Sequence, residues 1–235
     1  MITTVMIDLD GTLLPFNQDD FVKLYFEGLC KKVAPLGYDP KTLIKDVWSG
    51  TAAMVKNDGS RINHDAFWET FKANNPEKPD IEPLCDDFYT REFDAVKICL
   101  KYQISRKSLI ERLRAAGLDL ILATNPIFPM CAVETRLAWA GLSKEDFLYI
   151  TSYENSRFSK PNPKYFTEIL EKCGKSADEC VMIGNSVPED IIPTKTLGIR
   201  SYLIPEFLEN PDSVDIGGFK AFTLDGACED ILSLI

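Results

Sequence analysis

The sequence contains only one histidine, His64, among 235 residues. This excludes a metal site built from several imidazoles, and it leaves no choice of base for a serine–histidine triad. We expect His64 to be an ordinary residue near the start of a helix over 64–71. Any metal in this protein must then be held mainly by oxygen or sulfur donors.

Paired cysteines and long apolar runs are also missing. No two cysteines have Cys-x-x-Cys spacing, and their number is odd: Cys30, Cys85, Cys99, Cys131, Cys173, Cys180 and Cys228. We expect reduced, mostly buried thiols in a reducing compartment. The apolar run over 2–7 is too short for a signal core or a membrane span, so we expect a cytoplasmic protein with no membrane partner.

Positive charge is the third shortage, because 26 basic residues face 36 acidic ones and the net charge is −10. General nucleic-acid binding needs a basic footprint, so we expect no nucleic-acid partner. An anionic substrate would have to be attracted by a local positive site or by a metal. Composition says nothing of the oligomeric state.

The most informative segment is the apolar run over 2–7 and the residues that follow it. It ends in Asp8 and Asp10, and Gly11 and Thr12 come next. A short apolar run rich in β-branched residues predicts a buried parallel strand, whose carboxyl end is where open α/β sheets place their ligands. Taken alone, the segment is equally compatible with a strand that stops at an Asp-Gly turn.

The rest of the chain divides into two segments with different predicted secondary structure. Residues 16–100 show helical periodicity without a convincing strand, and they predict four helices: three that begin near Asn17, Pro40 and His64, and a fourth over 83–96. From residue 105, expected helices over 105–116, 127–140, 163–173 and 188–197 alternate with expected strands over 118–123, 147–151, 180–183 and 201–204. A weak strand over 221–224 and a final helix complete the pattern. Alternation of this kind predicts a parallel sheet with helices on both faces.

Each later strand is followed by polar residues. Thr124 and Asn125 follow the strand over 118–123, and Lys160 precedes the helix that begins at Pro163. The strand over 180–183 is followed by residues 184–190, which read Gly-Asn-Ser-Val-Pro-Glu-Asp. Helix capping, a surface lysine and acids in a first helical turn account for each piece separately. These separate explanations do not account for the occurrence of polar residues at four strand ends on the same edge of one sheet.

This ordered set resembles the haloacid dehalogenase superfamily of hydrolases. Residues 8–12 look like its first motif, Thr124 like its second, Lys160 with Pro161 like its third, and residues 184–190 like its fourth. The resemblance implies an α/β fold: a Rossmann-like core of residues 1–15 and 101–235, with an inserted all-helical cap of residues 16–100. Two departures are Asn185, where the family usually has aspartate, and the Pro-Phe-Asn run over 15–17.

The resemblance also implies a magnesium-dependent phosphatase acting on a small phosphorylated molecule. Asp8 would be the nucleophile and Asp10 the general acid and base, while Thr124, Asn125 and Lys160 would hold the phosphoryl oxygens. The donors for Mg²⁺ would be Asp8, the Asp10 main-chain carbonyl, Asn185 and Asp190, with Glu189 a further candidate.

Two other functions stay open. A dehalogenase would use the same nucleophile but needs no acid for a halide, so Asp10 favours phosphoryl chemistry. A non-catalytic binding or regulatory protein is suggested by Asn185.

In the predicted cap, two groups of residues could contact a substrate. Basic side chains could hold a second anionic group, although most are expected to be solvated: Lys23, Arg61, Arg91 and Lys97. Aromatic side chains could face a ligand, although a role in the core of the helical unit is the better expectation: Phe67, Trp68, Phe71, Phe88, Tyr89 and Phe93.

Overall fold

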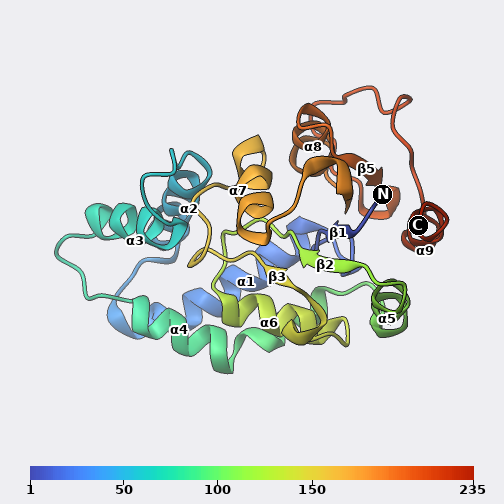
Figure 1. Ribbon diagram of the computed structural model, residues 1–235. Helices are drawn as coiled ribbons and strands as arrows, with labels where there is room; N and C mark the ends of the chain where they lie inside the picture. Colours follow the sequence, from blue (N-terminus) through green and yellow to red (C-terminus); the bar gives the residue numbers. More distant parts are fainter.

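A parallel sheet of five strands organises the chain in the computed structural model, which describes residues 1–235 (Figure 1). The strands are β1 (Thr4–Ile7), β2 (Asp119–Leu122), β3 (Tyr149–Ile150), β4 (Cys180–Gly184) and β5 (Arg200–Leu203). Their order is β3-β2-β1-β4-β5, and every neighbouring pair is parallel. β1 is therefore central and wholly buried, as its apolar sequence predicts. The expected α/β class is confirmed.

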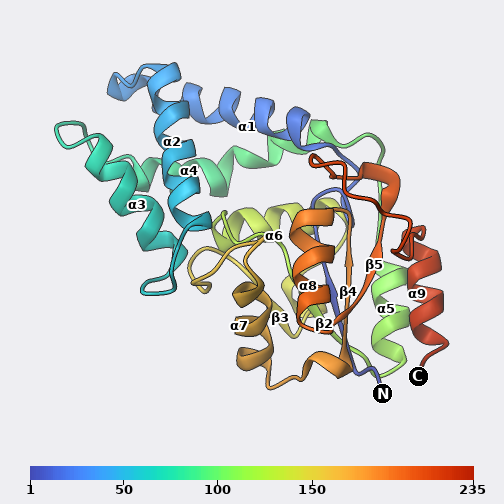
Figure 2. The same ribbon diagram turned by 90° about the horizontal axis from the view of Figure 1, so that it is seen from above.

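Helices cover both faces of this sheet (Figure 2). One face packs against α5 (Lys107–Ala115), α6 (Met130–Trp139) and α9 (Leu224–Leu232), and the other against α7 (Pro163–Cys173) and α8 (Ile192–Thr196). Alternate residues of β1 supply the two cores: Val5 and Ile7 belong to the first, and Met6 to the second.

Residues 18–99 contain helices joined by loops, and no strand. The elements are α1 (Gln18–Val33) with a short 3₁₀ turn after it (Ala34–Leu36), α2 (Pro40–Val55), α3 (Asn63–Asn74), α4 (Glu82–Arg91) and a 3₁₀ segment, Phe93–Cys99. Asn17 caps α1 by accepting from the Asp20 amide at 3.3 Å, and Asp39 caps α2 in front of Pro40. Figure 2 shows these helices beyond the end of the sheet to which the strands point.

Several expected boundaries were wrong. The helix expected over 127–140 begins only at Met130, because Pro129 disfavours helical geometry at Phe128 and itself serves as the N-cap. The segment over 188–197 is a π-helical turn, Val187–Ile191, followed by α8. The strand expected over 221–224 is a single bridge between Leu203 and Ala221, since α9 already begins at Leu224. The fourth helix ends at Arg91, and the chain continues as the 3₁₀ segment.

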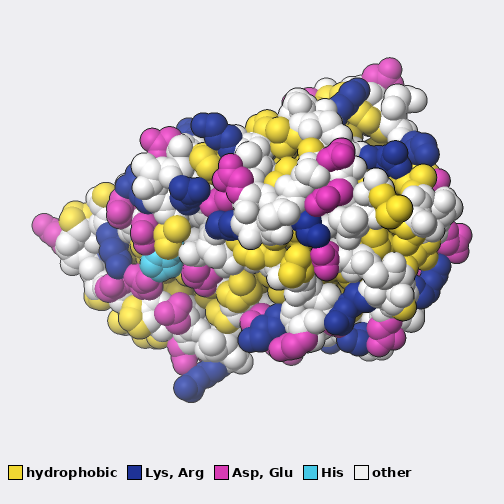
Figure 3. Space-filling model, in the orientation of Figure 1, with side chains coloured by type: hydrophobic (Ala, Val, Ile, Leu, Met, Phe, Trp, Pro, Cys, Tyr) yellow, Lys and Arg dark blue, Asp and Glu magenta, His cyan; other side chains and the backbone are white.

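On the face shown in Figure 3, acidic and basic side chains are interspersed and no basic patch is visible. None of the helices is both long enough and apolar enough to cross a membrane.

Candidate active site

The carboxyl ends of β1 and β4 and the loops after β2 and β3 bring the predicted site residues together. Asp8 follows β1 directly, and its amide donates to the Ile183 carbonyl of β4 at 2.9 Å. Thr124 and Asn125 follow β2, while Asn185 follows β4. Lys160 comes from the loop between β3 and α7. The polar residues predicted at four strand ends therefore lie together at one edge of the sheet.

Lys160 lies between two carboxylates. Its Nζ donates to Asp8 Oδ1 at 2.8 Å and to Asp190 Oδ1 at 2.6 Å, and only 1% of the residue is exposed. Burial alone would lower the pKa of Lys160, but Asp190 and Asp8 outweigh burial and raise it well above its ordinary value. The lysine is therefore charged, and it fixes the position of Asp8.

Asp190 is oriented from both sides. Its second oxygen, Oδ2, accepts from the Ser186 amide at 3.0 Å. A Cβ at Gly184 would lie 2.2 Å from this oxygen, so only glycine leaves room for the carboxylate. The glycine that begins the fourth motif thus allows Asp190 to reach Lys160.

Asn185 presents an oxygen to the site. Its Nδ2 donates to the Phe207 carbonyl at 2.7 Å, which assigns the amide orientation. Its Oδ1 accepts from Thr12 Oγ1 at 3.0 Å, and the same hydroxyl makes a longer contact of 3.4 Å with Asp8 Oδ2. Asn185 therefore contributes a neutral oxygen beside Asp8. Gly11, at φ 77°, gives the amide room, because a Cβ there would lie 2.3 Å from Asn185 Nδ2.

Asp10 forms an ion pair with Arg136 of α6, whose side chain is completely buried. Burial raises the pKa of Asp10 to about 6, although Arg136 lowers it and the neighbouring Asp8 adds to the rise. Its other oxygen, Oδ1, is buried without a hydrogen-bond partner. Asp8 and Asp10 thus have different surroundings: Asp8 contacts a lysine, whereas Asp10 contacts an arginine and keeps one buried oxygen without a partner.

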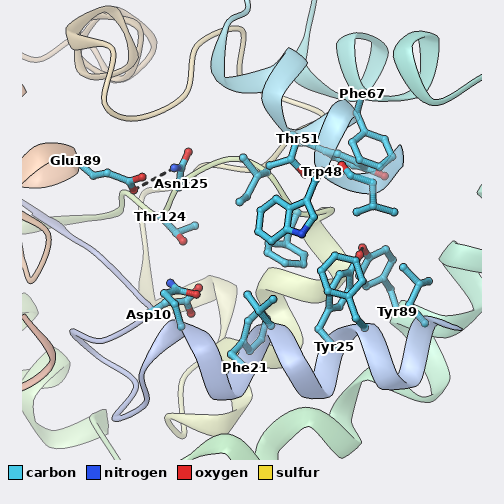
Figure 4. Close-up of a pocket in the computed structure, with 18 of the residues that line it drawn as sticks. Asp10, Phe21, Tyr25, Trp48, Thr51, Phe67, Tyr89, Thr124, Asn125 and Glu189 are labelled. Carbon is cyan, nitrogen blue, oxygen red and sulfur yellow. Dashed lines mark hydrogen bonds between the residues drawn. The ribbon is translucent and has the colours of Figure 1, made fainter. Parts of the chain in front are cut away.

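Two glutamates add to the acidic excess. Glu189 accepts from Asn125 Nδ2 at 3.0 Å, shown as the dashed line in Figure 4, and Asn125 Oδ1 is buried without a partner. Burial raises the pKa of Glu189 and of Glu209 to about 7. Burial also raises the pKa of Asp190, and Lys160 opposes that rise.

The acidic residues described above line one end of a cavity of about 260 Å³, together with Thr124, Asn125 and Asn185. Figure 4 shows Asp10, Thr124, Asn125 and Glu189 at this end and aromatic side chains at the other. Of the six aromatics singled out in the segment predicted to be a cap, Phe67, Trp68, Phe71 and Tyr89 line the cavity, whereas Phe88 and Phe93 belong to the core alone. Thr124 and Asn125 precede α6 in a loop; they do not cap it, contrary to the expected helix start.

The donor set fits the magnesium ion that the family resemblance implies. Asp8, Asp190, Asn185 Oδ1 and the Asp10 carbonyl all offer oxygen, which Mg²⁺ prefers. Five carboxylates line this end of the cavity (Asp8, Asp10, Glu189, Asp190 and Glu209), and only two buried cations, Lys160 and Arg136, balance them. No three acidic, thiol or imidazole groups converge on one point. A cation here would therefore keep water ligands or use neutral oxygens.

Sequence reasoning missed Arg136 and Glu209. The signal for Arg136 was present, because it shares a helical face with the buried Ala132, Val133 and Leu137, and a charge on an apolar face implies a buried partner. Glu209 belongs to the loop after β5 and reaches Ser186 through a backbone bridge, for which the sequence gives no signal.

The chain is similar to known proteins in sequence and in fold. The profile of the haloacid dehalogenase-like hydrolase family matches residues 2–198, and the chain belongs to that family of hydrolases. The chain is 38% identical over 58 residues to haloacid dehalogenase-like hydrolase domain-containing protein 3 of Danio rerio, a match of 25% of this chain and 24% of that protein. It is 26% identical to a phosphoglycolate phosphatase of Agrobacterium fabrum, over 93% of this chain and 89% of that one. The crystal structure of a phosphatase of the same superfamily from Thermococcus onnurineus superposes with a TM-score of 0.59 at 20% identity, over 98% of both chains.

Proposed function

We propose that this hydrolase is a magnesium-dependent phosphatase that cleaves small phosphomonoesters through an aspartyl-phosphate on Asp8. The observation that carries the proposal is the contrast between two neighbouring carboxyl groups. Asp8 contacts Lys160 at 2.8 Å, and Asp10 has a pKa raised to about 6. A carboxylate held by a lysine is suited to be the nucleophile, and a carboxyl group whose pKa burial raises is suited to donate a proton.

The proposed reaction has two steps. An Asp8 oxygen bonds to phosphorus while the bond from phosphorus to the ester oxygen breaks, and Asp10 gives its proton to the departing alkoxide. Asp10 then takes a proton from water, which attacks the phosphorus and breaks the bond to Asp8, releasing inorganic phosphate. Lys160, Thr124 and the Asn125 amide orient the phosphoryl oxygens.

Mg²⁺ held by Asp8, Asp190, Asn185 and the Asp10 carbonyl would reduce the repulsion between the nucleophile and the phosphate dianion. The helices of residues 16–100 would act as a cap that excludes bulk water and contacts the leaving group. Release of inorganic phosphate from p-nitrophenyl phosphate and from a panel of small phosphate esters, with and without Mg²⁺, tests the proposal. No release from any ester would leave the non-catalytic alternative.

Asp10→Asn is expected to lower kcat/KM for alkyl phosphates by about 100- to 10,000-fold, because the alkoxide then leaves without a proton. The value for p-nitrophenyl phosphate should fall far less, since nitrophenolate departs unprotonated. Water activation is also lost, so acid-quenched enzyme should carry a phosphoryl group at Asp8, detectable by mass spectrometry. Because Arg136 loses its charged partner, thermal unfolding of the variant is the control. Equal losses for both ester types would contradict the acid role.

Asn185→Asp is expected to lower the Mg²⁺ concentration for half-maximal activity by about tenfold or more, since a full charge replaces a neutral donor. The Phe207 carbonyl loses its amide donor, so thermal stability without Mg²⁺ should fall while the increase on adding Mg²⁺ grows. Asp190→Asn should raise the half-maximal concentration. A magnesium titration of the three proteins, followed by activity and by thermal unfolding, measures both. If the half-maximal Mg²⁺ concentration of Asn185→Asp equals that of wild type, the neutral Asn185 does not weaken the magnesium site.

A further inference from the structure

The cavity continues from the acidic end into a pocket walled by aromatic rings. Figure 4 shows Phe21 and Tyr25 of α1, Trp48 of α2, Phe67 of α3 and Tyr89 of α4 around this space. Each ring comes from the helical segment that follows the first motif. The hydroxyls of Tyr25 and Tyr89 are hydrogen-bonded to each other at 2.8 Å, which uses one of their two protons. A leaving group attached to a phosphoryl group beside Asp8 would extend among these rings.

No lysine, arginine or histidine is among the residues that line the cavity, and the two buried cations of the site, Lys160 and Arg136, contact carboxylates at the sheet end. The four basic cap residues singled out in the sequence lie elsewhere, and two of them form surface ion pairs, Arg61 with Glu69 and Arg91 with Asp87. A second phosphate or carboxylate on the leaving group would therefore be buried without a counterion, which is strongly unfavourable. The expectation that cap lysines and arginines hold such a group finds no support.

The aromatic end of the cavity also has no counterion for a positively charged leaving group. All five carboxylates that line the cavity belong to the sheet end, and the aromatic end contains none. Ring faces attract quaternary ammonium groups, but an ammonium that donates hydrogen bonds would lose its water there and meet no carboxylate in return. An uncharged apolar group loses little on leaving water and gains contact with every wall.

The volume limits the size of this group. A cavity of about 150 Å³ lined by apolar side chains holds a benzene molecule. The 260 Å³ available here therefore has room for a phosphoryl group and roughly one ring.

We propose that the preferred substrate is the phosphomonoester of an uncharged, apolar alcohol whose leaving group is about the size of one ring. This inference rests on the proposed phosphatase function and adds the substrate class.

The test compares esters of primary alcohols, which all need a proton on leaving: benzyl phosphate, ethyl phosphate, phosphoglycolate and phosphocholine. With Mg²⁺ present, kcat/KM for benzyl phosphate should exceed the other three by roughly 10- to 100-fold, the gain expected from burying an aromatic ring. A kcat/KM for phosphoglycolate or phosphocholine equal to or above that for benzyl phosphate would overturn the inference and leave the phosphatase function standing.

A binding measurement separates the two proposals if no ester turns over. Benzylphosphonate should bind at least about tenfold more tightly than methylphosphonate in a calorimetric titration with Mg²⁺. Turnover of none of the esters would end the phosphatase proposal, while this titration would still decide the preference. Equal affinities would overturn the apolar pocket.

Two variants locate the preference. Trp48, which is 48% exposed, can be truncated without opening a closed core, and Trp48→Ala should lower the ratio of kcat/KM for benzyl over ethyl phosphate by roughly tenfold. Thr51→Arg adds a guanidinium to the wall and should shift the preference toward phosphoglycolate. Leu148→Ala, at a similarly exposed position that is not part of the cavity, is the matched control and should leave both ratios unchanged. Ratios in both pocket variants equal to those of the control would place the leaving group elsewhere.

Discussion

Asp8→Asn should reduce phosphate release by about a thousandfold or more, because an amide cannot form the aspartyl-phosphate. The fold should persist. Asparagine has almost the shape of aspartate, Lys160 keeps Asp190 as its ionic partner at 2.6 Å, and Asn185 still accepts from Thr12. Steady-state phosphate release from p-nitrophenyl phosphate measures the loss, and thermal unfolding checks the fold.

Asp46→Asn is a matched control for that experiment. Asp46 is another buried aspartate, located on α2, where it accepts from Asn75 Nδ2 at 3.0 Å. The same chemical change at this position should leave turnover within a few-fold of wild type. Mass spectrometry of Asp8→Asn excludes deamidation as the source of residual activity. A folded Asp8→Asn protein that keeps turnover within a few-fold of wild type would refute the assignment of Asp8.

The sequence predicted the sheet well because its strands are short, apolar and bounded by glycine or polar residues. β1 and β4 are buried on both faces, so an unbroken apolar run was sufficient to identify each. Helix α7 was predicted to the residue, since Asn162 caps it, Pro163 begins it and Gly174 ends it in a left-handed conformation. Helix starts were predicted wrongly where two signals competed: before α6, both Pro126 and Pro129 could mark the start, and the helix begins after the second.

The site was predictable only to the level of strand ends. Parallel strands bring their carboxyl ends to one edge, so Asp8, Thr124 and Asn185 could be placed together without coordinates. Lys160 is different, because its local sequence favoured a surface lysine, and only tertiary packing shows that it is buried between two acids. The aromatic end of the cavity could not be predicted either. Helical periodicity tells which rings are apolar and inward-facing, but not whether they meet one another or line a space.

The Lys160 ammonium has a structural role that can be separated from its role toward phosphate. It is the cation in direct contact with Asp8 and Asp190, and all three side chains are at most 10% exposed. Removing one partner of a buried ion pair leaves uncompensated charge, and this costs more than the pair itself contributes. The loss of the lysine should therefore affect folding as well as catalysis.

Lys160→Met, which keeps most of the side-chain volume, is expected to lower the free energy of unfolding by about 3–5 kcal/mol at neutral pH without Mg²⁺. Urea unfolding followed by circular dichroism measures this loss. Lys23→Met, the same change at an exposed lysine that makes no ion pair, should lie within about 0.5 kcal/mol of wild type. The double variant Lys160→Met/Asp190→Asn removes one of the two stranded charges and should recover part of the lost stability, because the sites are in direct contact and their effects cannot simply add. A Lys160→Met protein as stable as the Lys23→Met control would mean that Asp8 and Asp190 tolerate each other without a cation. The acidic excess at this edge of the sheet would then no longer support a bound metal ion.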